Sequence, residues 1–145
     1  MPAPTRQQSD RGALQDLYSD LPIRFPLVYE KLVLQYRWPE EAELGPLELL
    51  ANPPGDPSFS GLSRAIRYDR HLAAALLPAA FVPFARPAGG SWDPICFDGS
   101  VRAGKHDRQI VRIDHESILC NDRIKIEAVL APSFRSLIET ALAAR

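Results

Sequence analysis

The stretch that decides the fold runs from residue 81 to residue 116 and reads FVPFARPAGGSWDPICFDGSVRAGKHDRQIVRIDHE. It contains three short apolar segments, at residues 81–84, 94–97 and 109–115, which turn-rich connections separate. In the last segment, alternate side chains point to opposite sides with a period of two, as in a strand. The stretch therefore predicts a small antiparallel sheet.

Helical patterns lie on both sides of this sheet. Asp10 can cap a first helix that Pro22 ends, and Pro26 is suited to the first position of a second helix. A C-terminal helix is expected to begin at Pro132, because apolar residues then recur at helical spacing. The predicted helices cover residues 11–21, 26–37, 61–77 and 132 onward.

Other segments are less regular. Residues 44–50 indicate a short strand that Gly45-Pro46 interrupts, since proline favours an edge strand or a bulge. Gly89-Gly90 predicts a turn, and residues 99–107 a long polar connection. Residues 117–131 fit a strand or a helix, and both alternatives stay open.

Length and composition indicate one ordinary globular domain. The 145 residues are enough to bury a core without a disulfide or a metal. We expect residues 1–9 to be a flexible tail and residues 10–145 to form a single α+β domain. Its central, mostly antiparallel sheet would be flanked by N-terminal helices and a C-terminal helix. Within it, we expect one core cluster, formed by Phe97, Val111, Ile113 and Phe134.

The charge argues against some partners. The net charge is -1, so nonspecific electrostatic binding to nucleic acid is not expected.

The N-terminus lacks an apolar signal region, and the chain has no apolar run long enough to cross a membrane. We therefore expect a cytoplasmic protein without a membrane role. Cys96 and Cys120 are then expected to be reduced thiols.

The sequence contains no assembled catalytic motif. It has no GxSxG, P-loop or GxGxxG pattern, and its cysteines and histidines lack zinc spacing. Asp93, Asp98 and Asp107 could converge on a metal, but they lack the pattern of a calcium loop. If His115 ends a strand, its acidic neighbours point to the opposite face, which disfavours a triad there. We expect no catalytic residue, no metal and no cofactor.

Two tryptophans and a group of acidic residues are the candidates for partner binding. Each tryptophan lies at the end of a predicted element, where it can cover the core or anchor a partner. The acidic residues that follow the second helix can be a solvated surface or can steer a basic partner. The expected contact residues are Trp38, Glu40, Glu41, Trp92 and Asp93.

An ordered set of short motifs runs through the chain. The motifs are Leu21-Pro22, Val82-Pro83-Phe84-Ala85, Gly89-Gly90, Cys96-Phe97-Asp98, Val111 with Asp114-His115-Glu116, and Ser133-Phe134 with Leu137. In this order they resemble the SUKH superfamily of Smi/Knr-like proteins, from about residue 15 to residue 143. The chain departs from the family pattern where Ser91-Trp92 precede Asp93, where Ile113 replaces an aromatic residue, and at residues 36–39.

The resemblance implies an α+β fold and a role without catalysis. Bacterial members of the family act as immunity proteins that bind and neutralise a polymorphic toxin, often a nuclease, whereas eukaryotic members resemble regulatory scaffolds. We therefore expect an immunity protein that covers the active site of a toxin, for example a basic toxin such as a nuclease. A regulatory or scaffold domain with another protein partner is the alternative. A small hydrolase that uses His115 or His106 is a third.

Overall fold

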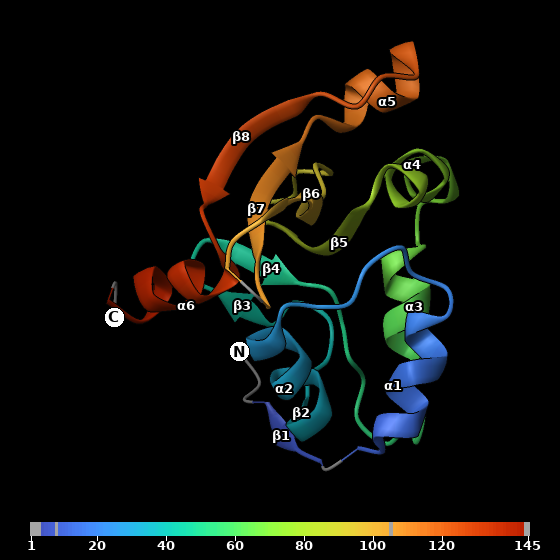
Figure 1. Ribbon diagram of the computed structural model, residues 1–145, viewed down its shortest axis with the longest axis vertical. Coiled ribbons are helices and arrows are strands. Elements are labelled where there is room, and N and C mark those ends of the chain that lie inside the picture. The colour runs from blue at the N-terminus through green and yellow to red at the C-terminus, as the bar shows by residue number, and fades with distance from the viewer. Residues whose placement is uncertain (1–3, 8, 105, 144–145) are drawn as a thin grey trace.

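The computed structural model describes residues 4–7, 9–104 and 106–143, and they form an α+β fold (Figure 1). The strands of the main sheet are β3 (Glu43–Leu44), β4 (Leu47–Leu49), β5 (Phe81–Pro87), β6 (Ile95–Arg102), β7 (Arg108–Ile113) and β8 (Ile126–Ala131). Each strand pairs antiparallel with the next, so the sheet order follows the chain order. The predicted antiparallel sheet is thus confirmed, and it is larger than expected.

The helices surround this sheet. They are α1 (Arg11–Tyr18), α2 (Leu27–Gln35), α3 (Ser60–Ile66), α4 (Arg70–Leu76), α5 (His115–Asn121) and α6 (Phe134–Ala143), and a 3-10 turn covers Leu77–Ala79. Asp10 caps α1 as predicted, because its carboxylate accepts from the backbone N–H of Gly12. The single helix predicted over 61–77 is wrong. Asp69 instead caps α4 by accepting from two backbone N–H groups, and this divides the segment into α3 and α4.

Several predicted boundaries of strands and loops differ from those in the structure. Gly45-Pro46 forms the turn between β3 and β4, and Gly45 has a φ of 57°, in the left-handed region that suits glycine. The long connection predicted over 99–107 is shorter, since β6 continues to Arg102. Residues 117–131 contain both alternatives, the end of α5 followed by β8.

The N-terminal segment, expected to be a flexible tail, contributes a strand. β1 (Thr5–Arg6) pairs antiparallel with β2 (Tyr36–Arg37), so the second helix ends before the predicted residue 37. The Arg37 guanidinium is 1% exposed and donates to the Ser9 hydroxyl at 2.6 Å and to the Pro53 carbonyl at 3.1 Å. These bonds hold the segment before α1 against the loop that precedes α3. Residues 1–3 and 8 lie outside the described residues.

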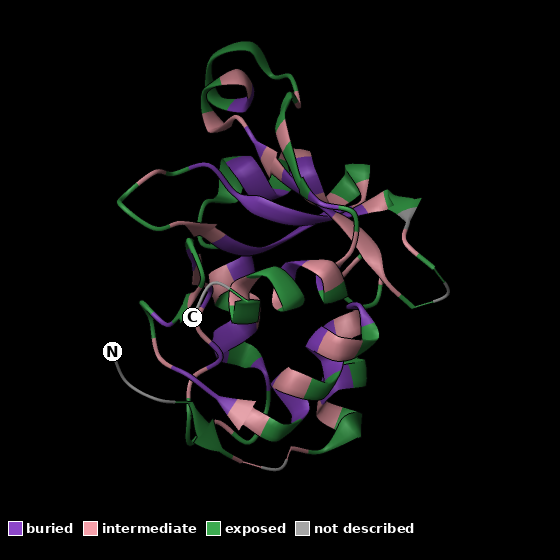
Figure 2. Ribbon diagram, turned by 90° about the vertical axis from the view of Figure 1, so that its left-hand side faces the viewer, coloured by how far each residue is buried: buried purple, intermediate pink, exposed green. Residues whose placement is uncertain are grey.

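The first face of the sheet carries an aromatic core beneath α2 and α6. The rings of Phe84 and Phe97 stack at 4.2 Å, and Phe134 from α6 meets both edge-on. Tyr29 from α2 adds edge contacts to all three rings. In Figure 2 the buried strands form a purple layer with the N-terminal helices below it.

The second face carries a smaller core under α4 and α5. Val111, Ile113 and Cys96 pack there with Leu76 and Ile118. The single cluster predicted from Phe97, Val111, Ile113 and Phe134 is therefore wrong. Cross-strand register explains the error: Phe97 lies opposite Ile110, whereas Val111 lies opposite Cys96 on the other face.

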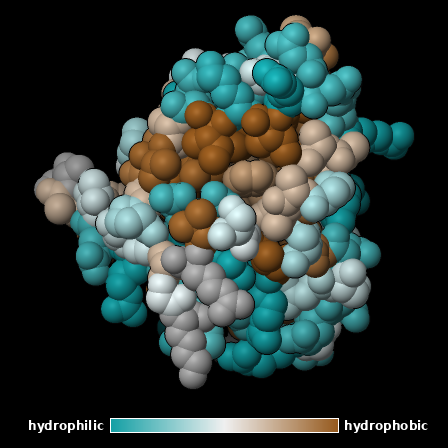
Figure 3. Space-filling view, turned by 45° about the horizontal axis from the view of Figure 1, so that its top comes forward, coloured by the Kyte–Doolittle hydropathy of each residue, from teal (hydrophilic) through white to brown (hydrophobic). Residues whose placement is uncertain are grey.

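Part of the surface remains apolar. Ile126, Val129 and Leu130 of the edge strand β8 are 38–55% exposed, and Figure 3 shows the apolar side chains gathered in this region of the surface. Cys96 is buried and Cys120 is exposed, and both are free thiols. Within the described ranges, we find no helix that combines the length and the apolar character needed to cross a membrane.

Candidate functional site

Three of the five predicted contact residues line one surface hollow, which we call the groove. It lies beside β4, β5 and α3 and has a volume of about 230 Å³. Its walls combine acidic and aromatic side chains with one arginine over an apolar floor. We define it by six residues: Glu40, Glu41, Glu48, Tyr68, Arg86 and Trp92.

The acidic wall comes from the turn between β2 and β3 and from β4. Glu40 and Glu41 are exposed, and Glu48 is half-buried on β4. Glu41 has a φ of 69°, a left-handed conformation that costs a residue with a Cβ atom about 1 kcal/mol or more. Strained positions of this kind cluster at functional sites, so the turn is a candidate contact segment.

The aromatic wall comes from two loops that are distant in sequence. Trp92, between β5 and β6, is 56% exposed, and Tyr68, between α3 and α4, is 75% exposed. The guanidinium carbon of Arg86 lies 5.3 Å from the centre of the Trp92 ring, within the range of a cation–π contact. Large exposed aromatics are the residues that most often dominate protein interfaces.

The floor is apolar and is supported by Trp38. Leu50 and Ala65 form part of it, and a smaller hollow of about 50 Å³ continues from them toward Leu72. Trp38 is only 3% exposed, so it presents no surface to a partner. Its indole N–H donates to the Leu50 carbonyl at 2.8 Å, which fixes the floor from below. We therefore place Trp38 in the core and leave it out of the contact set.

Asp93 holds the loop that carries Trp92, rather than lining the groove itself. Its side chain is buried, and its Oδ2 accepts from Arg112 Nε at 2.7 Å. Its Oδ1 accepts from the backbone N–H of His115 at 3.1 Å and lies 2.5 Å from Nδ1 of the same residue. Burial alone would raise the pKa of Asp93, but the bonds from His115 and Arg112 lower it below its ordinary value. Asp93 thus clamps the loop that carries Trp92.

His115 is not at the end of a strand, as predicted, but at the start of α5. Asp114 caps this helix by accepting from the backbone N–H of Glu116 and from the Ser117 hydroxyl. The carboxylate beside the His115 ring comes from Asp93 rather than from a sequence neighbour. Among the described residues, no hydroxyl or thiol hydrogen-bonds to this ring, which favours a supporting role over a nucleophile–base pair.

Asp93, Asp114 and His115 also form a possible metal-ligand group. One potential ligand atom from each lies within 4.8 Å of the others. However, both carboxylates already accept hydrogen bonds from protein donors, and the positive charge of Arg112 contacts Asp93. A divalent cation would have to displace these donors, so we interpret the group as a structural clamp. The other predicted metal candidates, Asp98 and Asp107, also accept bonds from nearby protein groups.

The sequence interpretation missed Tyr68 and Arg86. The helix predicted over residues 61–77 places Tyr68 in its interior, although Asp69 is a typical cap residue that signals a break beside it. Arg86 reaches the groove because β5 extends past Ala85 and pairs Arg86 with Glu48. That pairing depends on the register of two strands far apart in sequence, which local patterns do not give.

Comparisons with models of protein families, with curated proteins and with solved structures found no match to this chain.

Proposed function

We propose that this chain is a non-enzymatic domain that binds a basic segment of a partner protein in the groove. The observation that carries the proposal is the meeting of exposed aromatics and carboxylates around one hollow. At about 230 Å³, the hollow is smaller than most sites that enclose a small ligand. Its size is better suited to a side chain that projects from a protein surface.

The two walls would act at different stages of binding. Glu40 and Glu41 are exposed, so they attract a cationic segment over several ångströms and raise the association rate. Trp92 and Tyr68 would then bury apolar area against the segment and slow its dissociation. A lysine or arginine of the partner could stack on Tyr68 while its charge meets the carboxylates.

The resemblance to the SUKH superfamily makes a toxin the first candidate partner. In that case the chain is a cytoplasmic immunity protein, and it neutralises a nuclease or a similar enzyme by covering its active site. The carboxylates would occupy positions where a basic nuclease holds phosphates. A complex of this kind buries about 1,200–2,000 Å² in total, so surface around the groove would take part.

A regulatory or scaffold role would use the same groove with a partner that is not a toxin. Inhibition of the partner distinguishes the two roles, because occlusion abolishes catalysis and scaffolding does not. The hydrolase alternative needs turnover by the isolated chain that depends on His115 or His106.

The test uses the protein encoded beside this chain's gene. The two proteins are co-purified, and hydrogen exchange is compared between the free chain and the complex. We expect protection at residues 38–42, 65–69 and 86–94, together with loss of the partner's enzymatic activity. Protection confined to other segments would contradict the groove, and binding without inhibition would favour the scaffold role.

A further inference from the structure

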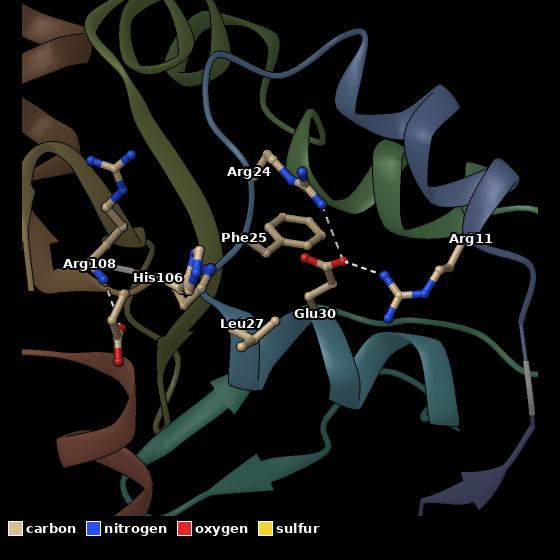
Figure 4. A pocket seen from close by; sticks show the side chains of 9 residues that line it. Arg11, Arg24, Phe25, Leu27, Glu30, His106 and Arg108 are labelled. Carbon is tan, nitrogen blue, oxygen red and sulfur yellow. Dashed lines mark hydrogen bonds and ion pairs between the residues drawn. The ribbon is translucent and has the colours of Figure 1, made fainter. Parts of the chain in front are cut away.

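A second hollow lies between the start of α1, the segment before α2 and the connection from β6 to β7 (Figure 4). We call it the arginine pocket, and it shares no residue with the groove. Its volume of about 400 Å³ is in the range of pockets that hold small ligands. The lining residues that matter here are Arg11, Arg24, Phe25, Leu27, Glu30 and His106.

Glu30 is the organising residue of the pocket. It is 4% exposed, and such a buried carboxylate needs partners. Its Oε2 accepts from the Tyr18 hydroxyl at 3.2 Å. Burial and the nearby charge of Glu30 raise the pKa of Tyr18, so this hydroxyl keeps its proton and remains a donor.

Two arginines approach the other oxygen of Glu30 from different elements. Arg11 and Arg24 each place one guanidinium nitrogen 3.5 Å from Oε1, and Figure 4 shows them reaching it from two sides. Their side chains are 70% and 64% exposed. Arg24 is also held over the Tyr18 ring at 5.2 Å, so its position is partly fixed before any ligand arrives.

The guanidinium groups have more donors than Glu30 can use. Each guanidinium carries five N–H donors in a planar fork, and one long contact to Glu30 engages few of them. Glu30 therefore aligns two cations without saturating them. An anion with two or three oxygens could bridge both, because arginine forks match phosphate and carboxylate geometry.

The remaining charges of the lining do not cancel this attraction. The carboxylate of Asp107 accepts from backbone N–H groups at the start of α6 and from that of Arg108. The Arg108 guanidinium donates to the Gly99 carbonyl and points away from the other two arginines (Figure 4). His106 lies on the opposite side of the pocket from Arg11 and adds a possible third donor.

We infer that the arginine pocket binds a small molecule with a phosphate or carboxylate head group. The head group bridges Arg11 and Arg24, and the apolar body of the ligand lies against Phe25 and Leu27. The side chain of Leu27 is part of this wall, and the residue is 39% exposed. This binding is independent of the proposed partner protein.

The experiment is a titration of the isotope-labelled chain followed by amide resonances at constant ionic strength. Phenyl phosphate and benzoate test the two head groups, inorganic phosphate tests the head group alone, and benzyl alcohol tests the apolar body alone. We expect phenyl phosphate or benzoate to shift the amides of Leu27, Glu30 and His106 with a Kd of about 1 mM or lower. The stronger of the two identifies the head group.

Matched variants locate the binding site. Arg24→Gln and Arg11→Gln should each weaken binding by about tenfold, since each removes a charge-assisted hydrogen bond. The affinity of Arg24→Lys should lie between those of the wild type and Arg24→Gln, because lysine keeps the charge but lacks the planar fork of donors. Arg64→Gln, an exposed arginine of α3, should have no effect. The inference is overturned if the amide shifts do not saturate or if benzyl alcohol binds as tightly as phenyl phosphate and benzoate. It is also overturned if Arg64→Gln weakens binding as much as Arg24→Gln does.

Discussion

The two faces of the main sheet are covered to different degrees. On the first face, Phe84 and Phe97 are fully buried beneath α2 and α6, and so is Phe134, which α6 contributes. On the second, α4 and α5 cover a smaller core, and the β8 side chain Val129 stays 55% exposed. The floor of the groove belongs to the first core through Leu50, and the smaller hollow beside it reaches Leu72 of the second core. The difference indicates that the first face contributes more to the stability of the fold, while the exposed loops beside the groove are free to serve recognition.

The largest expected effect tests this division directly. Phe134→Ala should lower the free energy of unfolding by about 3–5 kcal/mol, because it leaves a cavity among stacked rings. Val111→Ala on the second face should cost about 2 kcal/mol, since it removes fewer buried carbon atoms. Urea unfolding measures both. Equal costs, or a larger one for Val111→Ala, would contradict the proposed division.

A smaller effect is expected at Asp93, which clamps the loop that carries Trp92. Asp93→Asn should destabilise the fold by about 1–3 kcal/mol at neutral pH, because it weakens the bonds to Arg112 and His115. The folded-state pKa of Asp93 is lowered, so its contribution is present above the ordinary pKa of about 4 and is lost as the pH falls through the lower value.

The measurement compares wild type and Asp93→Asn in urea at neutral and at acidic pH. The difference in the free energy of unfolding between the two proteins should shrink as the pH falls below about 4. A difference that stays constant into acid would mean that the carboxylate charge of Asp93 does not stabilise the fold.

Charge reversal in the acidic turn should affect binding more than stability. Glu40→Lys combined with Glu41→Lys should slow association with a basic partner severalfold. The slowing should be stronger at low salt, because dissolved ions screen the attraction between exposed charges. Asp16→Lys combined with Glu139→Lys, two exposed helix positions outside the groove, is the control with the same change in net charge. Surface plasmon resonance at two salt concentrations gives the rates. Equal slowing in the control would indicate an effect of net charge alone.

The smallest expected effect is at Glu41, where one substitution should stabilise the fold and weaken binding. Glu41→Gly should raise the free energy of unfolding by about 0.5–1 kcal/mol, since glycine adopts the left-handed conformation without strain. The same change removes a carboxylate from the groove and should slow association. Glu40→Gly, whose backbone is not in that region, should not stabilise. Thermal unfolding of the two variants decides whether the turn is strained.

Local patterns were enough to predict the α+β class and most elements. Turn residues and period-two alternation gave the antiparallel sheet, and Asp10 gave the start of α1. The assignment of side chains to the two faces failed, because the partner of Phe97 depends on strand register. The break at Asp69 was missed because apolar spacing continues across it.

The candidate site was predicted in part. Glu40, Glu41 and Trp92 follow from loop composition, and the fold brings them to one groove. Trp38 and Asp93 have similar sequence surroundings, yet both are buried and support the groove instead. Burial is decided by contacts with distant segments, Leu50 for Trp38 and His115 for Asp93, which a single sequence does not reveal.

The dissociation rate of the Trp92→Ala variant tests the groove most directly. This substitution removes an exposed side chain, so the urea midpoint should change little. Binding to the partner encoded beside the gene should weaken by about 2 kcal/mol or more through faster dissociation, whereas Leu142→Ala, an equally exposed apolar residue on α6, should keep the wild-type rate. Wild-type dissociation of a folded Trp92→Ala variant would contradict the groove as the binding site.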